Sequence, residues 1–289
     1  MTDAGPANCE IDEPDAWALV RAAKDAVFRT GDPALAISAG DSKTTIDVTA
    51  GGGWQSSFAV FPSAARILDI YLPYAASGKS LTVLAQVGQS LDGYIATATG
   101  HSHYVTDEAG LDHLHRLRAL SDAVVVGAGT AVADDPRLTV RRADGPNPVR
   151  AVIDVGGRVS RDRRMFHDGA APTLVLTSPD TLAGRALPDG VEAVAVAGTD
   201  GALPPAAIVK ALSARGLNRI LVEGGGVTIS RFLEANALDR LHVCVAPLII
   251  GSGRPALTLP PAGRLDEALR PSCRHYAMGD DMLFDLDLE

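Results

Sequence analysis

The chain has 289 residues, of which 46% are apolar and 4% aromatic, and can bury a sizeable core in one large domain or in two. Its net charge of −9 argues against general nucleic-acid binding, which needs a basic face, and no apolar run approaches the ~20 residues of a membrane-spanning helix. Three cysteines without CxxC spacing and a start without signal-peptide features predict a cytoplasmic protein that has no disulfide framework.

Residues 1–78 are predicted to form a small N-terminal extension, separate from a main domain at 79–289. The extension opens with an amphipathic pattern in which Trp17, Val20 and Ala23 recur at steps of three. Its predicted elements are a helix at 10–29, weak strands at 45–48 and 58–61, and a linker at 75–79. No residue here indicates a reaction, and a scaffold or a dimer contact is the favoured interpretation.

In the main domain, strands and helices alternate, which is typical of an α/β protein with a mostly parallel sheet. Short, nearly continuous apolar runs predict strands that are buried on both faces. The predicted strands are 81–87, 123–126, 149–154, 173–176, 191–197, 219–222 and 241–249, with 282–288 as a closing edge strand. The predicted helices are 107–120, capped by Thr106, then 204–215 and 227–236.

Two stretches, Ser90–Thr97 and Gly127–Leu138, follow predicted strands and break abruptly into Gly, Asp and Thr. In an open α/β sheet, ligands lie in the crevice beyond the carboxyl ends of the strands. If the two preceding strands are neighbours, these loops form the floor of a site for a phosphate-bearing ligand. An ordinary Rossmann site is not expected, because Val132 replaces the third glycine of the fingerprint and Asp134-Asp135-Pro136 leaves no room for the usual helix.

Three consecutive glycines, Gly224–Gly226, join a predicted buried strand to a helix. Glycine lets the backbone approach a ligand closely, and a helix N-terminus offers free N–H groups to a phosphate or pyrophosphate. A tight strand-to-helix turn is the alternative explanation. No Gly-Lys-Ser/Thr sequence follows, which excludes a nucleoside-triphosphate P-loop. Glu223 ends the strand at this crevice, where a carboxylate is costly unless it binds something.

Arg118 shares the apolar side of its predicted helix with Leu111 and Leu117. An arginine in such a place is seldom buried without an anionic partner. Contact with a ligand is one explanation, and an aliphatic stem that covers apolar surface is the other. The histidine pairs at 101/103 and 113/115 lack the further ligand spacing that a metal site requires, so no metal site is expected.

Four arginines follow the strand predicted at 149–154, namely Arg158, Arg161, Arg163 and Arg164. Cations beside a nucleotide crevice favour a 2′-phosphate, and therefore NADP over NAD. A solvated basic loop explains the same residues on charge alone.

Several ordered blocks resemble the reductase domain of the bifunctional riboflavin-biosynthesis deaminase/reductase and the stand-alone ribosylaminopyrimidine phosphate reductases. The resemblance covers about residues 81–289. The blocks that carry it are 90–96, 99–106, 117–119, 122–130, 133–141, 147–154, 221–225 and 246–251.

The resemblance implies a dihydrofolate-reductase-like three-layer sandwich: a mostly parallel central sheet with helices on both faces and an antiparallel C-terminal edge. It implies an NADPH-dependent oxidoreductase that converts a ribosylamino-pyrimidine 5′-phosphate to its ribitylamino form. The sugar opens to an imine, and hydride from the nicotinamide reaches its C1 carbon. A homodimer is expected on the same ground.

The resemblance also assigns residues by position. Those matching the family's substrate contacts are Ser102, Arg118, Leu138, Arg141 and Glu223. Those matching its cofactor contacts are Gly88, Tyr104, Thr130, Asp134, Gly225, Gly226, Val227, Thr228, Ile229, Ser230 and Arg231, to which the charge argument adds Arg158. Arg118 and Arg141 suit the substrate phosphate. No catalytic residue is identified; Asp92 and Glu223 are the candidates.

Two positions depart from the family pattern. Gln86 stands where family members usually carry a lysine, and Tyr94 where they carry a lysine or arginine. Reduction of a pterin or another heterocycle is therefore an alternative, and a non-catalytic nucleotide-binding paralogue is another. The N-terminal extension has no His-x-Glu and no Pro-Cys-x-x-Cys, so it cannot build the zinc site of the family's deaminase.

Overall fold

The computed structural model describes residues 10–29, 31–39, 44–102, 105–182, 187–198 and 201–289. The chain divides into two compact units, Met1–Thr82 and Val83–Glu289. Within the described residues, no helix combines the length and the apolar character that crossing a membrane requires.

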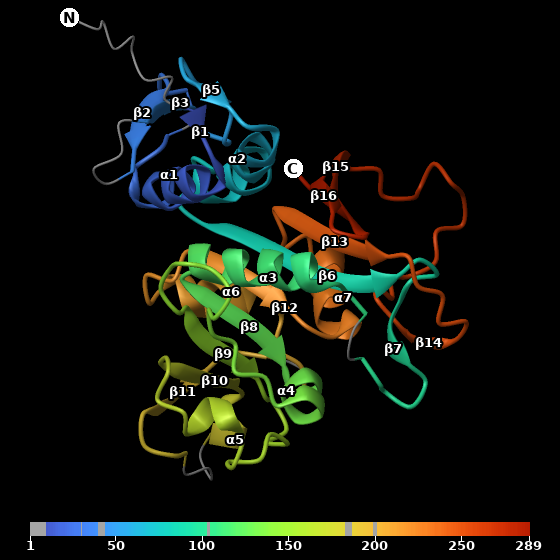
Figure 1. Cartoon of the computed structure of the whole chain (residues 1–289). Coiled ribbons are helices and arrows are strands. Elements are labelled where there is room, and N and C mark those ends of the chain that lie inside the picture. Colours follow the sequence, from blue (N-terminus) through green and yellow to red (C-terminus); the bar gives the residue numbers. More distant parts are fainter. Residues whose placement is uncertain (1–9, 30, 40–43, 103–104, 183–186, 199–200) are drawn as a thin grey trace, which may run out of the picture. The chain divides into compact units, whose positions relative to one another are not determined.

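The first unit packs helix α1 (Glu13–Asp25) against helix α2 (Pro62–Ala75), with the rings of Trp17 and Tyr71 meeting edge to face at 5.5 Å (Figure 1). Its short strands are β1 (Glu10–Ile11), β2 (Leu35–Ser38), β3 (Thr45–Val48), β4 (Trp54–Gln55) and β5 (Ala59–Val60). Strands β2, β3 and β4 pair antiparallel, whereas β1 and β5 pair parallel.

The predicted elements of this unit are partly right. Strand 45–48 is confirmed. The helix predicted at 10–29 is shorter: Asp12 caps its start by accepting a hydrogen bond from Asp15 N at 2.9 Å, and the extended backbone of Ala26 ends it. Helix α2 was not predicted. Nine of its fourteen residues are buried, and Pro73 stands inside it, a residue that in a sequence argues against a continuous helix.

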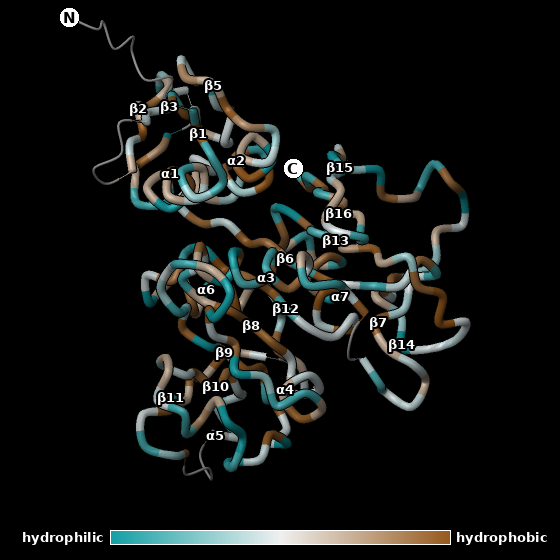
Figure 2. Tube along the Cα trace, in the orientation of Figure 1, coloured by the Kyte–Doolittle hydropathy of each residue, from teal (hydrophilic) through white to brown (hydrophobic). Residues whose placement is uncertain are grey.

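The second unit is built on a nine-stranded sheet in the order β11-β10-β9-β8-β12-β6-β13-β16-β15. The pairings β11–β10, β10–β9, β9–β8, β8–β12 and β6–β13 are parallel, and the pairings of β16 with β13 and β15 are antiparallel. Its strands are β6 (Thr82–Ser90), β8 (Ala123–Gly127), β9 (Val149–Ile153), β10 (Thr173–Thr177), β11 (Val191–Ala195), β12 (Arg219–Glu223), β13 (Arg240–Ala246), β15 (Ser272–Met278) and β16 (Asp281–Asp287). Figure 2 shows hydrophobic colouring along the central strands β8, β12 and β6, which form the core of the unit.

Helices cover both faces of this sheet. Helix α3 (Glu108–Leu120) lies in the connection from β6 to β8, which runs toward one edge. Helices α6 (Pro205–Ser213) and α7 (Gly226–Glu234) lie in connections that run the other way. Right-handed crossovers of opposite direction place their helices on opposite faces, as Figure 1 shows. The shorter elements are β7 (Tyr94–Thr97), α4 (Ala128–Asp134), η1 (Arg164–Phe166), α5 (Pro179–Leu182) and β14 (Gly253–Pro255). The predicted α/β architecture, a mostly parallel central sheet with helices on both faces and an antiparallel C-terminal edge, is confirmed.

Three details differ from prediction. Strand β12 lies between β6 and β8, so the two loops expected on neighbouring strands follow strands that are not neighbours. Strand β15, not β16, forms the edge. Its side chains are mostly exposed, and it joins the sheet through its backbone, so no apolar pattern marks it. A short helix, α4, forms where no helix was expected. It fits before Pro136 because it has only seven residues and ends at Asp135, which has a φ of 41°.

Helix α3 also differs in two respects. Its cap is Asp107, which accepts from Gly110 N at 2.9 Å, whereas Thr106 packs against Gly88. The buried stripe begins at Gly110 and includes His113, so Leu111 remains exposed.

Candidate active site

The turns after β8 and β12 are in direct contact. Gly225 N donates a hydrogen bond to Thr130 Oγ1 at 2.9 Å. Gly224 has a φ of +93°, and an added Cβ there would lie 2.7 Å from the same oxygen. Thr130 and Gly225, both predicted cofactor contacts, therefore lie together at the carboxyl ends of adjacent strands.

Close packing explains why glycine is needed around these turns. A Cβ on Gly226 would lie 2.4 Å from Pro255 O, and one on Gly127 would lie 2.5 Å from Thr228 Oγ1. A Cβ on Gly88 would lie 2.5 Å from Thr106 Cγ2, so the Thr106 side chain would have to shift. Close packing in a tight strand-to-helix turn is thus sufficient to explain these glycines. The first N–H groups of α7, beside this turn, have no partner within the helix and could also bind a ligand.

Arg118 and Glu223 form a buried ion pair. Arg118 Nε and Nη2 donate to the two carboxylate oxygens of Glu223, each at 2.8 Å, and both residues are 5% exposed. Arg118 Nη1 donates to Thr139 O at 3.1 Å. The anionic partner expected for a buried Arg118 is therefore a carboxylate of the chain itself, on the strand that leads into the glycine turn.

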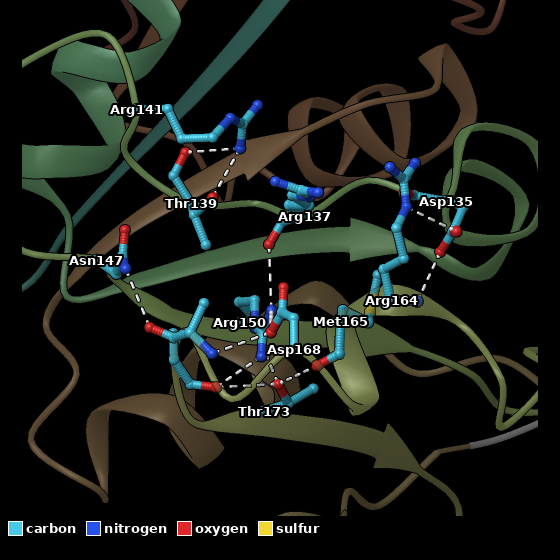
Figure 3. A network of polar contacts seen from close by, with 12 residues as sticks. Asp135, Arg137, Thr139, Arg141, Asn147, Arg150, Arg164, Met165, Asp168 and Thr173 are labelled. Atoms are coloured by element: carbon cyan, nitrogen blue, oxygen red, sulfur yellow. Dashed lines mark hydrogen bonds and ion pairs between the residues drawn. The ribbon is translucent and has the colours of Figure 1, made fainter.

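Arg141 lies beside this pair. Its Nη1 donates to Thr139 Oγ1 at 2.7 Å, and its backbone N donates to His115 Nδ1 at 2.8 Å. Burial, followed by the positive charges of Arg118 and Arg137, lowers the pKa of Arg141. The side chains of Arg137 and Arg141 lie in the same region in Figure 3. Positive charge here exceeds what Glu223 compensates, which is the condition for holding an anion.

A second set of contacts fixes the loop that carries these arginines (Figure 3). Arg164 binds Asp135 through its backbone N and its guanidinium, both at 2.9 Å. Arg150 is 1% exposed and donates to Asp168 at 2.7 Å and to Arg137 O at 3.3 Å. The predicted substrate contact Leu138 is buried in this loop with a φ of 55°. Arg150 and Arg164 thus hold the loop in one shape.

The remaining predicted cofactor contacts fall into two groups. Val227, Arg231, Asp134 and Arg158 are exposed, and Thr228 is half-buried. Ile229 and Ser230 are buried, and Ser230 Oγ accepts from Thr258 N at 2.7 Å, so these two side chains serve packing. Tyr104 lies outside the described residues, and Ser102, which precedes it, is half-buried.

Asp92 organises a loop. Its carboxylate accepts from Ser90 Oγ at 2.6 Å, Ile250 N at 3.1 Å and Gly251 N at 2.7 Å. The Ser90 hydroxyl, and then these backbone donors, hold the pKa of Asp92 below its usual value. Gln86 is buried on β6 with its amide 3.8 Å from Cys244 Sγ.

Sequence reasoning misses two residues of the site, Thr139 and His115. The spacing of His113 and His115 predicts only that no metal site is present, and no other pattern singles out His115 or Thr139. His113 Nε2 instead lies 3.1 Å from His242 Nδ1, away from Arg141. In the described part of the chain, no three His, Cys, Asp or Glu side chains are grouped so that they could hold a metal ion.

Residues 81–280 match the RibD C-terminal domain. The chain belongs to the RibD C-terminal domain family. A relative named 2,5-diamino-6-ribosylamino-4(3H)-pyrimidinone 5′-phosphate reductase, from Methanothermobacter thermautotrophicus, is 38% identical over 209 residues, which cover 70% of this chain and 95% of the relative. The riboflavin biosynthesis protein RibD of Escherichia coli K12 is 30% identical over 197 residues, and the match covers 63% of this chain and 53% of that protein.

The chain is also similar to a solved structure. That structure is the diaminohydroxyphosphoribosylaminopyrimidine deaminase/5-amino-6-(5-phosphoribosylamino)uracil reductase from Thermotoga maritima. The TM-score is 0.63 at 25% identity, over 80% of this chain and 64% of that one.

Proposed function

We propose that this chain is an NADPH-dependent reductase that converts a ribosylaminopyrimidine 5′-phosphate to its ribitylamino form in riboflavin biosynthesis. One observation carries the proposal: Glu223, which pairs with Arg118, continues directly into the Gly224–Gly225 turn that binds Thr130. A charged site suited to a sugar phosphate and a turn suited to a nucleotide phosphate are therefore adjacent. Family membership and the reductase relatives support the same conclusion.

The residues around the glycine turn fit NADPH. Gly224–Gly226 keep the backbone free of side chains, and the N-terminus of α7 provides the dipole end that attracts a pyrophosphate. Arg158, exposed on the loop after β9, suits the 2′-phosphate. When bound, NADPH would supply the hydride for the sugar C1 carbon.

On the substrate side, we assign Arg141 the direct contact with the phosphate. The Nε and Nη2 groups of Arg118, which would bind a phosphate bidentately, already bind Glu223. Arg118 therefore orients the Glu223 carboxylate, so that it can accept hydrogen bonds from the opened sugar. Asp92 keeps its charge because its pKa is lowered, so it orders the 250–251 loop and is a poor proton donor.

NADPH consumption tests the proposal. The purified chain is mixed with NADPH and with a ribosylaminopyrimidine 5′-phosphate, its dephosphorylated form or a panel of pterins, and the loss of NADPH absorbance is followed. We expect turnover only with the phosphorylated pyrimidine. Turnover with a pterin instead would favour the alternative that Gln86 suggests. NADPH binding without turnover on any of these compounds would indicate a non-catalytic paralogue.

We also propose a cytoplasmic homodimer, on the family resemblance and the sparse cysteines. Sedimentation of the purified chain tests the oligomeric state, and a mass equal to one chain at micromolar concentration would contradict it.

A further inference from the structure

The backbone of Arg141 is anchored by an imidazole. His115 on α3 is 3% exposed, and its Nδ1 accepts the hydrogen bond from Arg141 N at 2.8 Å. To accept, Nδ1 must carry a lone pair, so the ring is neutral with its proton on Nε2. The groups that face it are Arg118 and Asp112 on its own helix and Arg141 and Arg142 on the facing loop. Burial lowers the pKa of the His115 ring most, and three of these four groups are cations that lower it further, so the ring stays neutral.

The side chain of Arg141 is anchored by a second buried residue. Thr139 is 4% exposed, and its Oγ1 and backbone oxygen accept from Arg141 Nη1 at 2.7 and 3.3 Å. The same backbone oxygen accepts from Arg118 Nη1 at 3.1 Å. Thr139 therefore joins the two arginines, and both Arg141 contacts use the same terminal nitrogen. Among the described residues, no hydrogen-bond partner contacts Nε or Nη2 of Arg141, so this edge of the guanidinium can bind an anion.

An arginine on an exposed loop normally samples many rotamers, and fixing them costs binding free energy. Here the rotamers of Arg141 are already restricted in the folded protein, because His115 holds its backbone and Thr139 holds its guanidinium. We propose that His115 and Thr139 are positioning residues that hold Arg141 ready to bind a phosphomonoester. The inference rests on the proposed function for the identity of the substrate, but the anchoring itself concerns only the phosphate group.

Ribose 5-phosphate is a suitable probe, because it carries the phosphate without the pyrimidine. Its affinity for the full chain would be measured by calorimetry for the wild type and for His115→Phe, Thr139→Val, His115→Asn and Arg141→Ala. We expect His115→Phe and Thr139→Val each to weaken binding roughly tenfold, since each removes one hydrogen bond from Arg141. His115→Asn should restore most of the affinity, because the asparagine Oδ1 branches from Cγ where the histidine Nδ1 does.

His113→Phe is the matched control. It makes the same substitution two residues earlier on the same helix at a similarly buried histidine, whose Nε2 faces His242 and not Arg141. A general loss of helix packing would weaken ribose 5-phosphate binding in His113→Phe as well, whereas positioning predicts a loss in His115→Phe alone. Equal affinity in the wild type and His115→Phe, or no binding by the wild type, would overturn the proposal.

A double-mutant cycle completes the test. In an Arg141→Ala background, His115→Phe and Thr139→Val should have no further effect on ribose 5-phosphate affinity, because the group that they position is gone. Additive losses would overturn the proposal. If the wild type binds ribose 5-phosphate with this pattern yet never consumes NADPH with the pyrimidine, the proposed function fails and the positioning role stands.

Discussion

Arg118 on α3 and Glu223 at the end of β12 are separated by 105 residues in the chain and meet in a buried bidentate pair. Each charge would be costly to bury alone, so the two residues depend on each other. Glu223 leads directly into the Gly224–Gly225 turn. Under the proposed function, stability and substrate binding therefore depend on the same contact.

Breaking this pair should affect the fold and the substrate site together. Arg118→Met leaves the Glu223 carboxylate buried without its partner, and we expect a loss of about 3–5 kcal/mol in the free energy of unfolding. Substrate affinity should fall far more than NADPH affinity, because Arg118 contacts Thr139 and Glu223 and not the glycine turn. Urea unfolding, KM for the pyrimidine and NADPH titration measure the three quantities.

The double variant Arg118→Met/Glu223→Leu separates the two effects. Replacing both charges with apolar side chains should recover most of the stability, as it does for other buried pairs, but not the substrate affinity. Equal losses of substrate and NADPH affinity in Arg118→Met would contradict the role assigned to Arg118.

Gly226 should not tolerate a methyl group. An alanine Cβ there would lie 2.4 and 2.5 Å from the backbone oxygens of Pro255 and Ala256, so the start of α7 would have to move. We expect Gly226→Ala to cost about 1–3 kcal/mol of stability and to weaken NADPH binding. Thermal unfolding and NADPH titration provide the measurements.

Gly129→Ala is the comparison. Gly129 lies within α4 with nothing inside 4 Å of an added Cβ, so alanine there should stabilise the chain by about 0.5–1 kcal/mol. If the two alanine variants unfold at the same temperature, the steric explanation for Gly226 is wrong.

Local patterns in the sequence identify most of the sheet, but not its order. The apolar runs of β8, β10 and β12 mark strands buried on both faces, and these are confirmed to within a residue or two. No local pattern states that β12 inserts between β6 and β8, because that order depends on contacts between distant segments. Strand β15 is not predicted for a different reason. Its backbone pairs with β16 while its side chains are mostly exposed, so its sequence has no apolar pattern.

The same limit applies to the candidate site. A buried arginine on a helix and a carboxylate at a strand end each indicate an unmet charge, so Arg118 and Glu223 could be singled out separately. Their pairing with each other could not be, because it needs the fold. His115 contacts only the backbone N–H of Arg141, and Thr139 contacts one nitrogen of its guanidinium. Neither contact produces a pattern of spacing or composition that could be recognised in the sequence.

Arg158 should distinguish NADPH from NADH. Its backbone N is held by Asp154 Oδ1 at 2.8 Å, so its loop is ordered while its side chain is exposed. We expect Arg158→Ser to weaken NADPH binding roughly tenfold and to leave NADH binding unchanged, because only NADPH has the 2′-phosphate. Arg215→Ser, which removes an exposed arginine paired with Glu192, should change neither affinity. An equal loss for both dinucleotides in Arg158→Ser would rule out the assignment.

The stability of the fold should fall as the medium becomes acidic, because two buried histidines are held neutral. Burial, with the charge of Arg118 next, lowers the pKa of His115 from 6.5 to about 4, and burial lowers the pKa of His113 well below 6.5. Between pH 6.5 and about 4, these histidines bind protons in the unfolded chain but not in the folded chain. The free energy of unfolding therefore decreases as pH falls. His115 should contribute on the order of 2–3 kcal/mol of this loss.

Urea midpoints of the wild type, His113→Phe and His115→Phe across this window measure the effect. Asp281, whose pKa is raised by burial, opposes it, so the comparison between variants isolates the histidines. Each phenylalanine variant should lose less stability on acidification than the wild type does, because it has one fewer imidazole to protonate on unfolding. Parallel pH profiles for all three proteins would show that these histidines do not carry the acid sensitivity.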